Sequence, residues 1–148
     1  MKFILLILMV VLIPFTALAG DKIKGTSFYS GDTQGWDTGD GTGYWISHNK
    51  GVAHSTEGPL GTTPLECHGA GGFDKEGSWS EGICVQGAGD DTAIYSWKTD
   101  KGQEVGEWKY LTGAGKYTGI KGEGTYMYKD LPAGRGMSEW EGEVSLAK

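Results

Sequence analysis

The side chains in this sequence that are best suited to metal binding or redox chemistry are those of Cys67, His68 and Cys84. Thiolate and imidazole groups are the ligands that zinc and copper prefer, so these three could form part of a metal site. The two cysteines are the only ones in the chain, and two thiols that meet an oxidising compartment usually pair. We therefore predict a disulfide between Cys67 and Cys84, and neither a metal ion nor another cofactor. Closing a loop of about 16 residues stabilises a chain by about 3 kcal/mol.

A glycine-rich segment at 111–126 could be read as a nucleotide-binding loop. A phosphate-binding loop needs a glycine five residues before Gly115 and a serine or threonine after Lys116, but tyrosines occupy both positions. We instead predict a tight turn followed by a strand, with Gly115 or Gly119 in a conformation closed to residues with a Cβ. The residues that define this structural motif are Gly113, Gly115, Lys116, Tyr117, Gly119, Gly122 and Gly124.

The acidic residues form no recognisable catalytic or calcium-binding motif. The stretch 32–40 lacks the residue order of an EF-hand, and 87–94 resembles a single copy of a calcium-binding repeat that needs stacked neighbours. We interpret both as solvated turns, with weak calcium binding as the alternative, and we predict no catalytic residue. Four glutamates on or beside predicted strands could point into a cavity, although charged strand residues usually face solvent: Glu66, Glu81, Glu107 and Glu123.

The first 19 residues have the layout of a secretory signal peptide. Lys2 precedes an apolar run at 3–15, and Ala17-Leu18-Ala19 forms a small-x-small cleavage site. About 13 apolar residues are too few to span a bilayer, which takes roughly 20. We therefore expect residues 1–19 to be removed, leaving one domain at 20–148 that is periplasmic or secreted.

The composition excludes some classes of partner. The net charge is −6 and the basic residues are scattered, so neither nucleic acid nor an anionic membrane is an expected partner. The chain has 27 glycines together with six tryptophans and seven tyrosines. This aromatic content is too high for a disordered chain and indicates a folded domain.

Short alternating segments, separated by Gly and Asp-Gly, predict an all-β fold. Helical periodicity is nearly absent, and a sequential meander that closes on itself removes exposed edges. We therefore predict a small antiparallel up-and-down barrel of about eight strands. The expected strands are 23–29, 44–54, 62–68, 78–86, 92–98, 104–111, 122–128 and 137–146, with a turn region at 32–43 and a possible hairpin near 49–51.

The segment 111–126 also carries a family resemblance. It resembles the Gly-Thr-Gly-Lys-Tyr/Trp-x-Gly-Ile-x-Gly-x-Gly-Thr-Tyr signature of small exported bacterial proteins related to the allene oxide cyclase and dirigent barrels, and Gly82-Ile83-Cys84 is similar to their second cysteine. The resemblance implies an eight-stranded antiparallel barrel. The plant cyclases shape a lipid epoxide inside an apolar cavity, but no motif here matches their active-site residues.

Aromatic residues in the predicted strands suggest a ligand site. Side chains alternate between the two faces of a strand, so each of three pairs shares a face: Tyr95 with Trp97, Trp108 with Tyr110, and Tyr126 with Tyr128. A barrel this small is not expected to enclose all of these rings. We predict a concave aromatic surface that binds a small apolar or aromatic ligand, or a protein partner, without catalysis. The alternatives are a cyclase or isomerase that uses the same cavity and a structural protein with a filled barrel.

Overall fold

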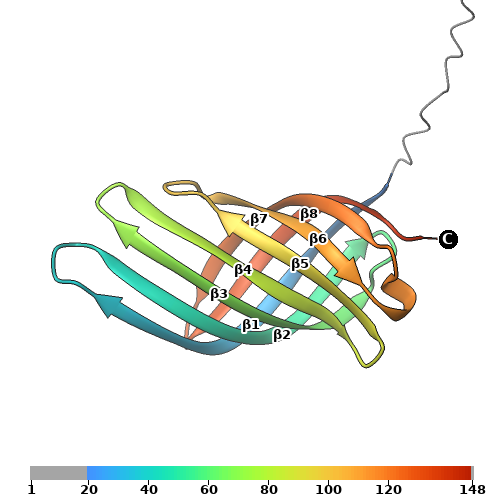
Figure 1. Cartoon of the computed structure of the whole chain (residues 1–148), viewed down its shortest axis with the longest axis horizontal. Coiled ribbons are helices and arrows are strands. Elements are labelled where there is room, and N and C mark those ends of the chain that lie inside the picture. Colours follow the sequence, from blue (N-terminus) through green and yellow to red (C-terminus); the bar gives the residue numbers. More distant parts are fainter. Residues whose placement is uncertain (1–19, 148) are drawn as a thin grey trace, which may run out of the picture.

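The computed structural model describes residues 20–147, so the predicted signal peptide at 1–19 lies outside the described residues. Over this range, eight antiparallel strands follow one another around a closed barrel, which confirms the predicted fold class (Figure 1). The strands are β1 (Asp21–Asp37), β2 (Gly43–Glu57), β3 (Thr62–Asp74), β4 (Gly77–Ala88), β5 (Asp91–Thr99), β6 (Val105–Gly113), β7 (Lys121–Leu131) and β8 (Arg135–Ser145).

The two ends of the barrel differ. One end, which we call the turn end, carries the β1–β2, β3–β4, β5–β6 and β7–β8 connections. The other, which we call the plugged end, carries both ends of the described chain and the short 3₁₀ helix η1 (Gly115–Tyr117). At the plugged end, Leu60, Tyr117 and Ile120 pack into one buried cluster with Ile23 and Val144. This cluster closes the barrel on that side.

One local prediction was wrong, and one open alternative is decided: the segment 44–54 is a continuous strand without a hairpin. Residues 32–37 continue β1 instead of turning, so that Trp36 pairs with Tyr44 and the turn is confined to 38–42. Residues 49–51 form no hairpin, because Lys50 pairs with Ser30 on one side and with Glu66 on the other. Pairing on both edges satisfies every backbone polar group, and this outweighs the local turn preference.

The glycine-rich segment 111–126 turns as predicted. Gly115 and Gly119 have φ values of +58° and +73°, which residues with a Cβ rarely adopt. The turn buries Tyr117 in the plugged end, and the backbone N–H of Lys116 donates to Asp91 Oδ1 over 2.9 Å. Gly113 lies against Tyr117 and Ile120. The segment therefore seals the plugged end.

Glycines make room for the large rings inside the barrel. A Cβ on Gly25 would lie 2.3 Å from the Trp140 ring, and one on Gly82 would lie 2.5 Å from the Trp97 ring. In both pairs the glycine is the direct cross-strand neighbour of the tryptophan. Gly124 of the patterned segment serves in the same way against Trp108, whereas Gly122 lies against the backbone of β8 at Glu143 and Val144. Without these glycines the rings would collide with the neighbouring strands.

The predicted disulfide joins two neighbouring strands of the barrel, β3 and β4. Cys67 on β3 and Cys84 on β4 are direct cross-strand partners, both buried, and they are bonded to each other. The bond therefore cross-links the β3–β4 hairpin. It also excludes thiolate ligation by either cysteine, so the metal site considered for Cys67, His68 and Cys84 cannot form from these three residues.

Removing the disulfide should lower the stability of the barrel. The Cys67→Ser/Cys84→Ser double variant loses the cross-link of the unfolded chain, so we expect its free energy of unfolding to fall by about 2–5 kcal/mol. Urea denaturation followed by circular dichroism measures the change. An unchanged midpoint would show that β-pairing alone holds β3 and β4 together.

A test of the glycine–ring packing compares two glycines of β1. Gly25→Ala places a methyl group 2.3 Å from both the His54 carbonyl oxygen and the Trp140 ring, and overpacking of this kind costs about 1–3 kcal/mol. Gly35→Ala is the matched control, because the added methyl group would be 3.7 Å from its nearest neighbour, the Tyr44 carbonyl oxygen, and we expect a change within about 0.5 kcal/mol. Equal melting temperatures for the two variants would contradict the packing argument.

Candidate ligand-binding lumen

The barrel encloses a cavity of about 830 Å³. Aromatic rings make up much of its wall, because inward positions on most of the strands carry them. The aromatic residues that line it include Tyr29, Trp45, Tyr95, Trp97, Trp108, Tyr110, Tyr126, Tyr128 and Trp140. The lumen is thus not filled by its own side chains.

All six aromatic residues singled out from the sequence line this cavity. They lie on three consecutive strands, two each on β5, β6 and β7, and so form one continuous wall. The rings of Tyr95 and Tyr110 meet edge to face with centroids 5.7 Å apart, and those of Trp97 and Tyr126 do so at 6.3 Å. Edge-to-face contacts of this type hold each ring in a defined orientation.

The barrel was not expected to enclose all of these rings, and it encloses five of the six. Facing glycines create the necessary space, as Gly106 does for Tyr126 and Gly136 does for Tyr128. Tyr128 is the outermost of the six and remains 52% exposed. The barrel holds the rings and still leaves a cavity.

Three further aromatic residues complete the opposite wall and were missed in the sequence analysis. Tyr29 on β1, Trp45 on β2 and Trp140 on β8 all line the lumen. Trp140 lies between two outward-facing glutamates, so strand alternation could have placed it on the inner face. Trp45 falls in a long alternating run with no charged neighbour to indicate its direction.

Buried polar groups of the lumen bind one another. Tyr110 Oη donates to Gln86 Oε1 over 2.6 Å, and Gln86 Nε2 donates to Thr63 Oγ1 over 2.9 Å. On the opposite wall, Trp140 Nε1 donates to Ser27 Oγ over 3.0 Å. These bonds satisfy groups that would otherwise be costly to bury, so the wall presents mainly ring surfaces to the cavity.

Formal charge in the lumen is confined to the turn end. Among the described residues that line the cavity, only Asp130 and Arg135 are charged. Both lie beside the β7–β8 turn. Serine and threonine side chains of other strands, such as Ser47, Ser78 and Thr99, also line the cavity at the turn end. The cavity therefore has a polar mouth at the turn end and an uncharged interior.

The candidate glutamates do not reach this interior. Glu66, Glu81, Glu107 and Glu123 all point to the outer face of the barrel, as their exposure and strand parity show. The solvent-facing alternative for these residues is therefore correct. No described acidic side chain other than Asp130 lines the cavity.

Burial keeps the phenols of the lumen neutral. Desolvation raises the pKa of Tyr95, Tyr110 and Tyr126 above the ordinary value. Desolvation, reinforced by the negative charge of Asp130, raises the pKa of Tyr128 to about 12. At neutral pH these hydroxyls can donate and accept hydrogen bonds, but they supply no basic phenolate.

Comparison with known proteins finds no match for this chain among family models, curated proteins or solved structures. Within residues 20–147 no helix is long and apolar enough to cross a membrane. An assignment of function therefore depends on the chemistry of the barrel itself.

Alkaline pH should unfold the barrel through these tyrosines. Below pH 10 the phenols are neutral in both the folded and the unfolded chain, so ionisation does not affect the free energy of unfolding. Above pH 10 the phenols of the unfolded chain ionise first, and the folded barrel loses stability as the pH rises through about 12, the pKa of Tyr128. Absorbance at 295 nm and circular dichroism should therefore change together in this range. Tyrosine ionisation that is complete near pH 10 in a still-folded barrel would mean that the lumen is hydrated.

Proposed function

We propose that this protein is an exported, non-enzymatic carrier or receptor that holds one small, uncharged, largely apolar ligand in its lumen. The observation that carries the proposal is the aromatic cavity of about 830 Å³ with a single polar mouth. Small-molecule sites typically have volumes of about 300–1,000 Å³ and are lined by apolar side chains with few polar groups.

The size of the cavity favours a ligand over a structural role. Barrels of about eight strands are either filled by their own side chains or hold one small ligand. This lumen keeps about 830 Å³ free although aromatic residues of most strands line it. A purely structural barrel would gain stability from filling that space, because voids forfeit packing contacts.

The distribution of polar groups indicates how a ligand would lie. Its apolar part would stack on Trp97, Trp108 and Trp140 in the uncharged interior. Its polar end would face the mouth, near Thr99 and Asp130. An ionised group deep in the lumen would lose its hydration without a partner of opposite charge.

The enzymatic alternative has less support. A cyclase or isomerase that works by acid–base catalysis needs a group that titrates near the working pH. The deeper lumen instead carries phenols whose pKa values burial has raised. We propose that this chain is related to the allene oxide cyclase and dirigent barrels in its fold, without sharing the reaction of the cyclases.

Two features support export. The Cys67–Cys84 disulfide is typical of proteins in oxidising compartments. The outer face carries alternating charged residues such as Lys109, Glu123 and Glu141, as expected of a barrel whose outside meets water. We infer a periplasmic or secreted protein.

A pair of related dyes tests the chemistry of the lumen. N-phenyl-1-naphthylamine is neutral and aromatic, and 8-anilino-1-naphthalenesulfonate adds a sulfonate to the same skeleton. We expect saturable binding of the neutral dye, at least about tenfold tighter than binding of the sulfonate, because the interior offers no buried cation. Fluorescence titration of the two dyes measures the difference.

A matched pair of variants locates the binding. Ser47→Trp adds an indole on the inner face, where Ser47 lines the cavity, whereas Ile46→Trp adds the same group on the outer face, where Ile46 is 49% exposed. We expect only the first to weaken binding of the neutral dye, with both melting temperatures close to that of the wild type. Equal binding by the two variants, or no binding by the wild type, would reject the lumen as a ligand site.

A further inference from the structure

A second cluster of chemically active side chains lies outside the lumen, on the outer face of β2 and β3. His48 and His68 are direct cross-strand partners, and Glu66 lies two residues before His68 on the same face of β3. The separation of His48 from these two residues along the chain conceals the pairing in the sequence. All three side chains are about half exposed or more.

The three side chains converge on one point. His48 Nε2 lies 2.7 Å from Glu66 Oε1, and His68 Nε2 lies 3.8 Å from the same oxygen. The two imidazole rings are stacked, with centroids 4.3 Å apart and planes inclined by 8°. The potential ligand atoms of the three residues all lie within 4.8 Å of one another.

We propose that His48, Glu66 and His68 bind a divalent transition-metal ion of the zinc and copper class. Neutral imidazole nitrogens and a carboxylate oxygen are the ligands that these ions prefer. Three ligands from a sheet surface leave at least one coordination position for water or for a group from another molecule. The site is therefore of the open type.

The spacing suits such an ion. Zinc–ligand bonds of about 2.0–2.1 Å in a tetrahedral site put neighbouring ligand atoms about 3.3 Å apart. The 2.7 Å and 3.8 Å separations to Glu66 bracket this value. Because the side chains are exposed, small rotations are enough to adjust them, and no buried group has to move.

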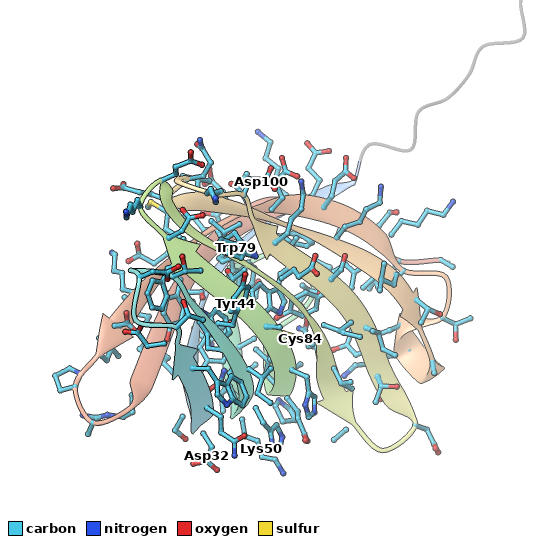
Figure 2. All side chains as sticks on the ribbon, turned by 60° about the vertical axis from the view of Figure 1, so that its left-hand side comes forward. Asp32, Tyr44, Lys50, Trp79, Cys84 and Asp100 are labelled. Atoms are coloured by element: carbon cyan, nitrogen blue, oxygen red, sulfur yellow. A yellow bond between two sulfur atoms is a disulfide. The ribbon has the colours of Figure 1, made fainter. Side chains whose placement is uncertain are left out.

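A neighbouring lysine holds the carboxylate in position. Lys50 Nζ lies 3.7 Å from Glu66 Oε2, so the other oxygen, Oε1, is the one that faces the histidines. Asp32 on β1 is the cross-strand partner of His48. In Figure 2, Asp32 and Lys50 both point away from the barrel, which places them on its outer face.

The disulfide supports the backbone behind this cluster. Cys67 lies between Glu66 and His68, faces the lumen and is bonded to Cys84 on β4. The segment that carries two of the three ligands is therefore cross-linked on its inner side. Ligands on a rigid, cross-linked strand lose less entropy when a metal binds.

Zinc titration of the untagged protein tests the proposal. Isothermal calorimetry should show one saturable Zn²⁺ site per chain and no heat from Mg²⁺, which prefers oxygen ligands. His48→Gln and His68→Gln should each weaken Zn²⁺ binding by at least about tenfold. His54→Gln is the matched control, since His54 lies on the same outer face of β2 but bonds Thr62 instead, and it should bind Zn²⁺ as the wild type does.

A spectroscopic measurement separates ligand loss from misfolding. Cu²⁺ bound to the wild type should show electron paramagnetic resonance coupling to two imidazole nitrogens, and His68→Gln should retain one. Glu66→Gln should weaken Zn²⁺ binding while both histidines remain. The proposal is rejected if the wild type shows no saturable site, or if His54→Gln lowers the affinity as much as His48→Gln does. Because the site lies outside the lumen, its failure would leave dye binding unaffected.

Discussion

The whole structure depends on the placement of glycines opposite aromatic rings on neighbouring strands. Adjacent strands are only about 4.8 Å apart, so an indole that bends towards its neighbour collides with any Cβ there. Gly69 and Gly82 flank the Trp97 ring, while Gly124 and Gly142 flank that of Trp108. These missing side chains allow an eight-stranded barrel to accommodate rings on almost every strand and remain closed. The high glycine content is thus a requirement of the interior and not a sign of a flexible chain.

The same packing decides the chemistry of the lumen. Glycines on neighbouring strands make room for the ring edges, and buried polar groups among the rings, such as Gln86 and Ser27, bond within the wall. Desolvation keeps the phenols neutral, so the interior is uncharged and rich in aromatic rings. The charged groups lie at the turn end. In the function proposed above, such an environment would select ligands by shape and by the absence of charge.

Strand alternation lets one segment carry two separate chemistries. Along β3, Glu66 and His68 face outwards, towards His48, while Cys67 between them faces inwards and is bonded to Cys84. The outer residues form the proposed metal site and the inner one supports the wall of the lumen. The two sites share a rigid backbone but no side chain, so a ligand inside and an ion outside would bind through different residues and can be disrupted separately.

The sequence by itself determined the elements of this protein. Period-two alternation predicted the strands and the barrel, the two cysteines predicted the disulfide, and residues such as Tyr95 and Trp97 were placed on a common face because local alternation requires it. Only the tertiary structure decided the cross-strand neighbours. That β1 extends to Asp37, that Gly25 meets Trp140 and that His48 meets His68 all follow from the register of strands distant in the sequence. Register is set by closure of the whole barrel, through backbone hydrogen bonds that every residue type can make, so it leaves little trace in the sequence of any single strand.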